Sequence, residues 1–114
     1  MEIKTRKSHN IIIYDIIGDI TIREVTPVTL HQHVKSQLEE GERNFLLNFE
    51  NIDFIDSYGV GELIASFISI SDLEGKLKIT KMSQKIRYLF DITALVRVFE
   101  IFDDEEEAIK SFSN

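Results

Sequence analysis

Cysteine is absent from this sequence, which excludes a disulfide framework and any metal site built on thiolates. Long apolar runs are absent as well, because none approaches the roughly 20 residues that a helix needs to cross a bilayer. No signal-peptide pattern opens the chain. We therefore expect a cytoplasmic protein without membrane insertion.

Positive charge is scarce, with 13 basic side chains against 20 acidic ones and a net charge of −7. This balance repels phosphate backbones and anionic lipid surfaces, so nucleic acid is not an expected partner. Solubility alone explains the excess of acidic residues. A functional interpretation is that an acidic surface pairs with a basic patch on another protein.

Repeats, low-complexity tracts and linkers are also missing, and 114 residues suffice for one compact domain but not for a second core. We therefore expect a single domain over residues 1–114. Short apolar segments bounded by polar residues predict strands at residues 3–7, 11–17, 44–49, 77–79 and 98–102.

Segments with helical periodicity alternate with these strands. The first helix is predicted to begin with Thr26 as N-cap and Pro27 in the first turn, and Gly41 provides its end. Its inner face consists of Leu30, Val34 and Leu38. A loop at residues 51–57 leads into a second helix, whose apolar face consists of Val60, Leu63, Ile64, Phe67 and Ile68.

Two further helices are predicted toward the end of the chain. Ser83 is expected to cap the third, whose inner face consists of Ile86, Leu89 and Phe90. Asp103, with Glu106 three residues later, fits the start of a last helix. Its apolar stripe consists of Ala108, Ile109 and Phe112. The alternation of helices and strands predicts an α/β fold with a mainly parallel sheet and covering helices.

The familiar signatures of enzymes do not occur. A dinucleotide loop would need a third glycine after Gly59 and Gly61, at the position of Ile64. A nucleophile elbow would need glycine two residues before Ser57, where the chain has Ile55. No convincing acid–base pair stands out either. We therefore predict no enzyme and no cofactor.

Metal binding is not indicated by the remaining polar residues. His31 and His33 are two residues apart on a predicted helix, so they face different directions and cannot share a metal. All three histidines are expected at the surface. Asp53 and Asp56 lie in a predicted loop, where an aspartate is more often a turn former or a helix cap than a catalyst.

One segment, residues 54–61, combines polar and flexible residues before the very apolar second helix. Asp56 or Ser57 can cap that helix, an interaction worth about 1 kcal/mol. Gly59 and Gly61 each cost about 1 kcal/mol of helix propensity relative to alanine. Such a cost in the first turns suggests that something packs or approaches closely there. On residue chemistry alone, cap and functional site are equally supported.

The same residues resemble the signature of the STAS family, the domains shared by anti-sigma factor antagonists and sulfate transporter tails. The family pattern runs hydrophobic, Asp, Ser, Ser or Thr, Gly, aliphatic, Gly, and here it stands as Ile55-Asp56-Ser57-Tyr58-Gly59-Val60-Gly61. The likeness covers most of the chain, from Gly18-Asp19 to Val98-Phe99-Glu100-Ile101. It implies a four- to five-stranded, mostly parallel sheet with helices packed largely on one face.

The resemblance also implies a function. In the bacterial antagonists the serine after the aspartate accepts phosphate from a partner that is both anti-sigma factor and serine kinase. The unphosphorylated antagonist sequesters that partner, and phosphorylation releases it. Carried over, Ser57 is the phosphorylation site, Asp56 positions it, and the two glycines permit close approach. The expected partner-binding residues are Asp56, Ser57, Tyr58, Gly59, Gly61 and Glu62. A serine phosphatase is a further expected partner.

Two positions depart from the family pattern. Tyr58 replaces the usual small hydroxyl residue, and we expect its ring to be exposed near the site. Glu62 adds charge where small or aliphatic residues are common. The alternative function is a non-enzymatic STAS scaffold in a stress-signalling assembly or a transporter complex, with Ser57 merely a cap. The sequence does not determine the oligomeric state, although a free strand edge is one route to dimers.

Overall fold

The computed structural model describes residues 1–24 and 26–113, and these residues form one five-stranded sheet in the order β1-β2-β3-β4-β5. The strands are β1 (Glu2–Ser8), β2 (Ile11–Ile17), β3 (Asn44–Asn51), β4 (Lys76–Thr80) and β5 (Glu100–Phe102). β1 pairs antiparallel with β2, and the other neighbours are parallel. The predicted mainly parallel sheet is confirmed.

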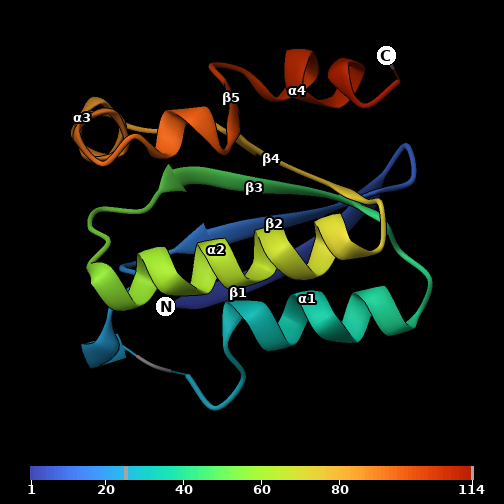
Figure 1. The fold of residues 1–114 in the computed structure, drawn as a ribbon, viewed down its shortest axis with the longest axis horizontal. Coiled ribbons are helices and arrows are strands. Elements are labelled where there is room, and N and C mark those ends of the chain that lie inside the picture. Colours follow the sequence, from blue (N-terminus) through green and yellow to red (C-terminus); the bar gives the residue numbers. More distant parts are fainter. Residues whose placement is uncertain (25, 114) are drawn as a thin grey trace.

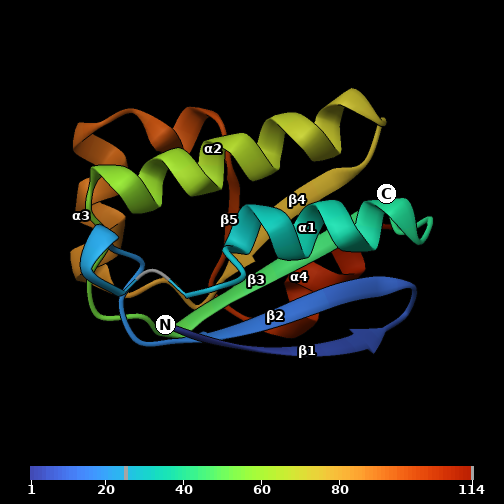
Figure 2. The same cartoon turned by 90° about the horizontal axis from the view of Figure 1, so that it is seen from below.

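Helices follow the strands in the order that the sequence predicts. They are α1 (Leu30–Glu39), α2 (Ser57–Asp72), α3 (Gln84–Ile92) and α4 (Glu105–Ser111), with short 3-10 turns η1 (Ile22–Glu24) and η2 (Leu95–Arg97). Figures 1 and 2 show α1 and α2 side by side on one face of the sheet and α4 on the other. α3 lies at the end of the sheet where α2 begins. No helix in the described part of the chain has the length and apolarity of a membrane span.

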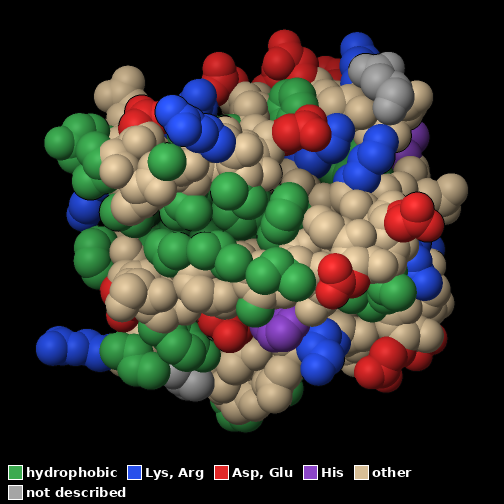
Figure 3. Space-filling view, in the orientation of Figure 1, with side chains coloured by type: hydrophobic (Ala, Val, Ile, Leu, Met, Phe, Trp, Pro, Cys, Tyr) green, Lys and Arg blue, Asp and Glu red, His purple; other side chains and the backbone are tan. Residues whose placement is uncertain are grey.

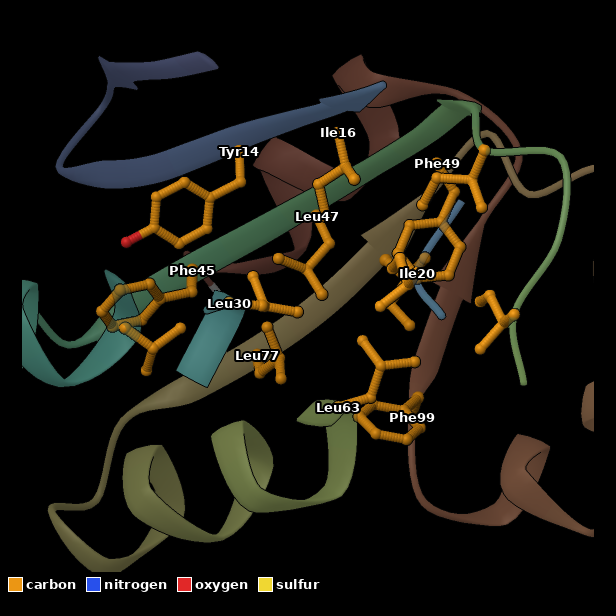
Figure 4. Packing of buried hydrophobic residues seen from close by; sticks show 14 of the residues in the cluster. Tyr14, Ile16, Ile20, Leu30, Phe45, Leu47, Phe49, Leu63, Leu77 and Phe99 are labelled. Atoms are coloured by element: carbon orange, nitrogen blue, oxygen red, sulfur yellow. The ribbon is translucent and has the colours of Figure 1, made fainter. Parts of the chain in front are cut away.

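The main core lies between the sheet and the pair α1 and α2. Tyr14, Phe45 and Leu47 from the sheet meet Leu30 of α1 and Leu63 of α2, and all five are buried (Figure 4). The opposite face of the sheet forms a smaller cluster with α4. Its buried members are Ile11, Ile13, Leu46 and Ala108. Alternate residues of β2 and β3 therefore serve two cores, because successive strand side chains point to opposite faces.

Charged side chains hold both ends of α4 against the sheet. At the N-terminal end, Arg6 of β1 donates hydrogen bonds to Asp15 (Nε to Oδ2, 2.8 Å) and to Glu105 (Nη1 to Oε2, 3.0 Å). At the C-terminal end, the buried Lys78 of β4 donates to the hydroxyl (2.8 Å) and the carbonyl (3.1 Å) of Ser111. The ammonium of Lys78 also lies 4.7 Å from the ring centroid of Phe112.

Two predicted helix starts are wrong by a few residues. α1 begins at Leu30 rather than Pro27, because Thr29 forms the N-cap. The Thr29 hydroxyl accepts from the Gln32 N–H, and the Gln32 side chain accepts from the Thr29 N–H, which completes a capping box. α4 is capped by Asp104 rather than Asp103, since the Asp104 carboxylate accepts from the Glu107 N–H at 2.8 Å.

One further boundary and the exposure of one residue differ from the sequence prediction. β5 begins at Glu100 rather than Val98, because the N–H groups of Val98 and Phe99 both donate to the Leu95 carbonyl and continue the turn η2. Ile68, predicted on the inner face of α2, is 52% exposed. The other predicted residues do face the core: Leu63 is buried, and Val60, Ile64 and Phe67 are partly buried against it. Gly59, Ser66 and Ile70 are buried as well.

Candidate functional site

Asp56 is the N-cap of α2 and joins two distant parts of the chain. Its Oδ1 atom accepts from the Gly59 N–H at 3.0 Å, which is the capping bond. Its Oδ2 atom accepts from the Ile22 N–H at 3.0 Å, in the turn η1 that follows β2. The hydrogen bonds from Ile22 and Gly59 hold the pKa of Asp56 below its usual range. The structure thus assigns the cap to Asp56 and leaves Ser57 free of that role.

Backbone contacts reinforce this junction. The Ile20 N–H donates to the Phe54 carbonyl at 3.1 Å, the Asp56 N–H donates to the Ile20 carbonyl at 3.4 Å, and Ile20 forms an isolated parallel bridge with Ile55. A Cβ on Gly59 would lie 2.0 Å from the Ile20 carbonyl oxygen. Gly59 is therefore required by packing inside the chain, where its missing side chain lets α2 approach the segment after β2.

Ser57 is the first residue of α2, and its side chain is exposed. No hydrogen bond within residues 1–24 and 26–113 engages its hydroxyl. The first backbone N–H groups of a helix lack partners inside the helix and carry the positive end of its dipole. A hydroxyl at this position is accessible to another protein, and an anion attached to it would meet a favourable field.

Tyr58 and Glu62 lie on the side of α2 that faces the start of α1. Tyr58, expected to be exposed, is half-buried and shares a small hollow with Met1, Glu24 and Glu62. Burial, then the charges of Glu62 and Asp56, raise the pKa of Tyr58. The Oε1 atom of Glu62 accepts from the backbone N–H of His31 at 3.1 Å, so Glu62 connects α2 to the start of α1.

Gly61 differs from Gly59 in its surroundings. It is exposed, and a Cβ added there would meet no atom within 4 Å. Nothing inside the described chain requires glycine at this position. Of the two glycines, Gly61 is the one whose bare backbone faces solvent beside Ser57, one helical turn further along α2.

His9 is exposed, as predicted, whereas His31 and His33 are more buried than predicted. His31 is half-buried, and its Nε2 atom lies 2.8 Å from the Ser69 hydroxyl of α2. His33 is half-buried and packs edge-on against the ring of Tyr14, with centroids 6.0 Å apart. Within the part of the chain that the structure describes, no group of three His, Cys, Asp or Glu side chains is placed to hold a metal ion.

Sequence reasoning missed the residues of other segments that lie near Asp56 and Phe54. Ile22, held by Asp56, is 60% exposed, and Phe54 is 47% exposed. Together with Asp19 and Arg23 they line an open hollow of about 430 Å³ beside Asp56. The Nζ atom of Lys85, from the start of α3, lies 5.6 Å from the Phe54 ring centroid. Only the tertiary fold brings these neighbours together, and no local sequence motif predicts them.

The family model described as STAS domain matches residues 2–108. The anti-sigma-B factor antagonist of Bacillus subtilis is 24% identical over 110 residues, which cover 96% of this chain and 98% of that protein. A crystal structure of a Thermotoga maritima protein superposes with a TM-score of 0.85 at 20% identity, covering 98% of this chain and 95% of the other.

Two structures of the anti-sigma factor antagonist SpoIIAA are also similar. The unphosphorylated form has a TM-score of 0.72 at 18% identity and covers 99% of both chains. The phosphorylated form, from Bacillus, has a TM-score of 0.73 at 19% identity and covers 97% of this chain and 99% of the other. The fold is thus that of the STAS-type α/β domains. The chain belongs to the STAS domain family.

Proposed function

We propose that this protein is an anti-sigma factor antagonist that binds an anti-sigma factor with serine kinase activity and is released when Ser57 is phosphorylated. One observation carries the proposal: Ser57 stands exposed and unpartnered at the start of α2, while Asp56 beside it fixes the helix end. The names of the relatives support the antagonist role. The role places the protein in the cytoplasm, where sigma factors act.

The charge of a phosphate explains how such a switch works without a change of fold. Phosphorylation adds about −1.5 to −2 charges and three acceptor oxygens. At the N-terminal end of α2 these oxygens lie at the positive end of the helix dipole, so the domain tolerates them. In a docked complex the same charge must be desolvated. A penalty of about 2.8 kcal/mol already weakens binding a hundredfold.

The residues proposed to bind the partner fall into two groups, those exposed to solvent and those that bind other parts of the chain. Ser57 and Gly61 face solvent, so a partner reaches them directly. Asp56, Gly59 and Glu62 act mainly through the chain itself: two hold the start of α2, and Glu62 holds α1. Tyr58 is half-buried and presents only part of its ring.

Intact mass after incubation with ATP and each purified anti-sigma factor kinase of the source organism tests the modification. We expect a single added phosphate on the wild type and none on Ser57→Ala. Binding of the unmodified variants tests the switch: Ser57→Ala should retain the anti-sigma factor, and Ser57→Asp should lose at least tenfold in affinity. Ser36→Asp, the same change at an exposed serine of α1, is the matched control and should bind like the wild type.

A second candidate function is a STAS scaffold without a phosphorylation switch. It is favoured by the finding that Asp56 and Gly59 already have complete roles inside the chain, as cap and as packing site. A stable complex with a partner that neither modifies Ser57 nor distinguishes Ser57→Ala from Ser57→Asp would support the scaffold and refute the switch.

In the first proposal, a serine phosphatase that removes phosphate from Ser57 would complete the cycle.

A further inference from the structure

The helix α3 carries apolar side chains on both its inner and outer sides. Ile86 and Phe90 are buried against the core. Tyr88 and Ile92, which share a face because they are four residues apart, are 67% and 63% exposed. Val96 and Val98, in and after η2, are exposed as well. An outer row of this kind, uncovered by the described chain, is typical of an interaction site.

Unpaired cations accompany these apolar residues. Residues 83–98 contain Lys85, Arg87 and Arg97 but one acid, Asp91, so this segment has a net charge of +2 in a chain of −7. The ion pairs found among the described residues engage none of the three cations. We call this surface the α3 face: it consists of Lys85, Tyr88, Ile92, Val96, Arg97 and Val98, and Arg87 lies on the side of α3 that also carries Asp91.

The α3 face is continuous with the surroundings of Ser57. Lys85 lies over the exposed ring of Phe54, three residues before Ser57. Figure 3 shows hydrophobic side chains gathered in a band over α2 and toward α3, with Lys and Arg side chains at its border. A protein large enough to cover Ser57 therefore also meets Lys85 and the outer side of α3.

We infer that the α3 face is a docking surface for an acidic protein surface, and that the anti-sigma factor of the proposed function supplies it; the inference rests on that function. Charge complementarity identifies the occupant, because Lys85 and Arg97, which take part in no ion pair among the described residues, lie beside apolar side chains and match carboxylates around an apolar patch. An anionic membrane offers the same sign of charge. The remainder of the chain, however, carries the whole negative excess and is repelled by such a surface.

Charge reversal on the α3 face tests the inference with the anti-sigma factor that binds the wild type. The variant Lys85→Glu/Arg97→Glu should bind at least tenfold more weakly and show a smaller loss of affinity with added salt. The matched control Lys35→Glu/Lys110→Glu makes the same change of charge at exposed positions of α1 and α4 and should stay within twofold. Tyr88→Ala, at a side chain that packs little, should also weaken binding about tenfold.

The outcomes separate this inference from the proposed function. Equal affinity of the wild type and the α3 variants for the anti-sigma factor would overturn the docking surface and leave the antagonist role intact. Absence of any complex with the wild type would refute both. Cosedimentation with vesicles of about one-third phosphatidylglycerol, lost in Lys85→Glu/Arg97→Glu, would show that the surface binds membranes instead. Equal melting temperatures would exclude misfolding of a variant as the cause.

Discussion

Gly59 lies against the carbonyl oxygen of Ile20 so closely that a Cβ on Gly59 would stand 2.0 Å from that oxygen. The obstacle is backbone, so only a separation of α2 from the segment after β2 relieves it. We expect Gly59→Ala to lower the free energy of unfolding by about 3 kcal/mol, as overpacking of a rigid site does. Urea denaturation measures this loss.

Gly61→Ala is the matched control on the same helix, and its effect should have the opposite sign. No atom lies within 4 Å of the added Cβ, and alanine favours the helix by about 0.5–1 kcal/mol. If Gly61 also permits the close approach of a partner, this stabilised variant should bind the anti-sigma factor more weakly. Unchanged binding would show that Gly61 is not part of the interface.

Removal of the Asp56 carboxylate should cost more than the loss of an ordinary cap. Asp56→Ala removes the capping bond to Gly59, worth about 1 kcal/mol, and the bond to Ile22, worth about as much again. We expect a loss of about 2 kcal/mol in urea denaturation. Asp53→Ala, at an exposed aspartate nearby, should change stability by less than about 0.5 kcal/mol. Similar losses in the two variants would contradict the dual role of Asp56.

Acid should weaken the attachment of α4 to the sheet, because Arg6 joins Asp15 to Glu105 of α4. Hydrogen bonds from Arg6 lower the pKa of both Asp15 and Glu105. A carboxyl whose pKa is lower in the folded state stabilises above its unfolded pKa of about 4, and this stabilisation is lost as the pH falls through the folded value.

Arg6→Met should therefore lower stability at neutral pH, and the difference from the wild type should shrink below about pH 4. Arg6 is 42% exposed, so water screens the pairs and the neutral-pH loss should be about 1 kcal/mol or less. Lys4→Met, an exposed cation on the same strand, is the control. Thermal denaturation across this pH range gives the comparison, and a difference between wild type and Arg6→Met that does not depend on pH would refute the coupling.

Substitution of Lys78 should destabilise α4 more than it destabilises any other helix. Lys78→Ala leaves the Ser111 carbonyl without its donor and opens space beside Phe112, so we expect a loss of about 2–3 kcal/mol. Amide hydrogen exchange should rise in α4 and change little in α1. Lys78→Met should cost less, because it keeps most of the volume and removes the desolvation cost of a buried charge. Unaltered exchange in α4 would contradict this anchoring role.

Much of the fold was predictable because local chemistry and tertiary structure agree. The apolar segment 11–17 becomes β2, and Ser83 caps α3 through the Ile86 N–H. The predictions failed where several residues offer the same local chemistry. Thr26 and Thr29 are both good caps, and only the Gln32 side chain decides between them.

The candidate site was predictable as a motif but not as an arrangement. The Asp-Ser pair and the two glycines were visible in the sequence, yet nothing local distinguishes Gly59 from Gly61. The difference comes from Ile20, which lies almost 40 residues away along the chain and packs against one of them. The bond from Ile22 to Asp56 likewise spans 34 residues, and the approach of Lys85 to Phe54 depends on where α3 docks.

The attachment of α4 has a practical consequence for the C-terminal boundary of the folded domain. The family match stops at residue 108, in the middle of α4. A chain shortened to that point would keep Lys78. It would lose Ser111, which accepts the hydrogen bonds of Lys78, and Phe112, whose ring covers the Lys78 ammonium. The uncovered lysine would then be solvated at the expense of the packing around Leu46. We therefore expect a stable form of this fold to need the chain through Phe112, beyond the boundary that sequence similarity draws.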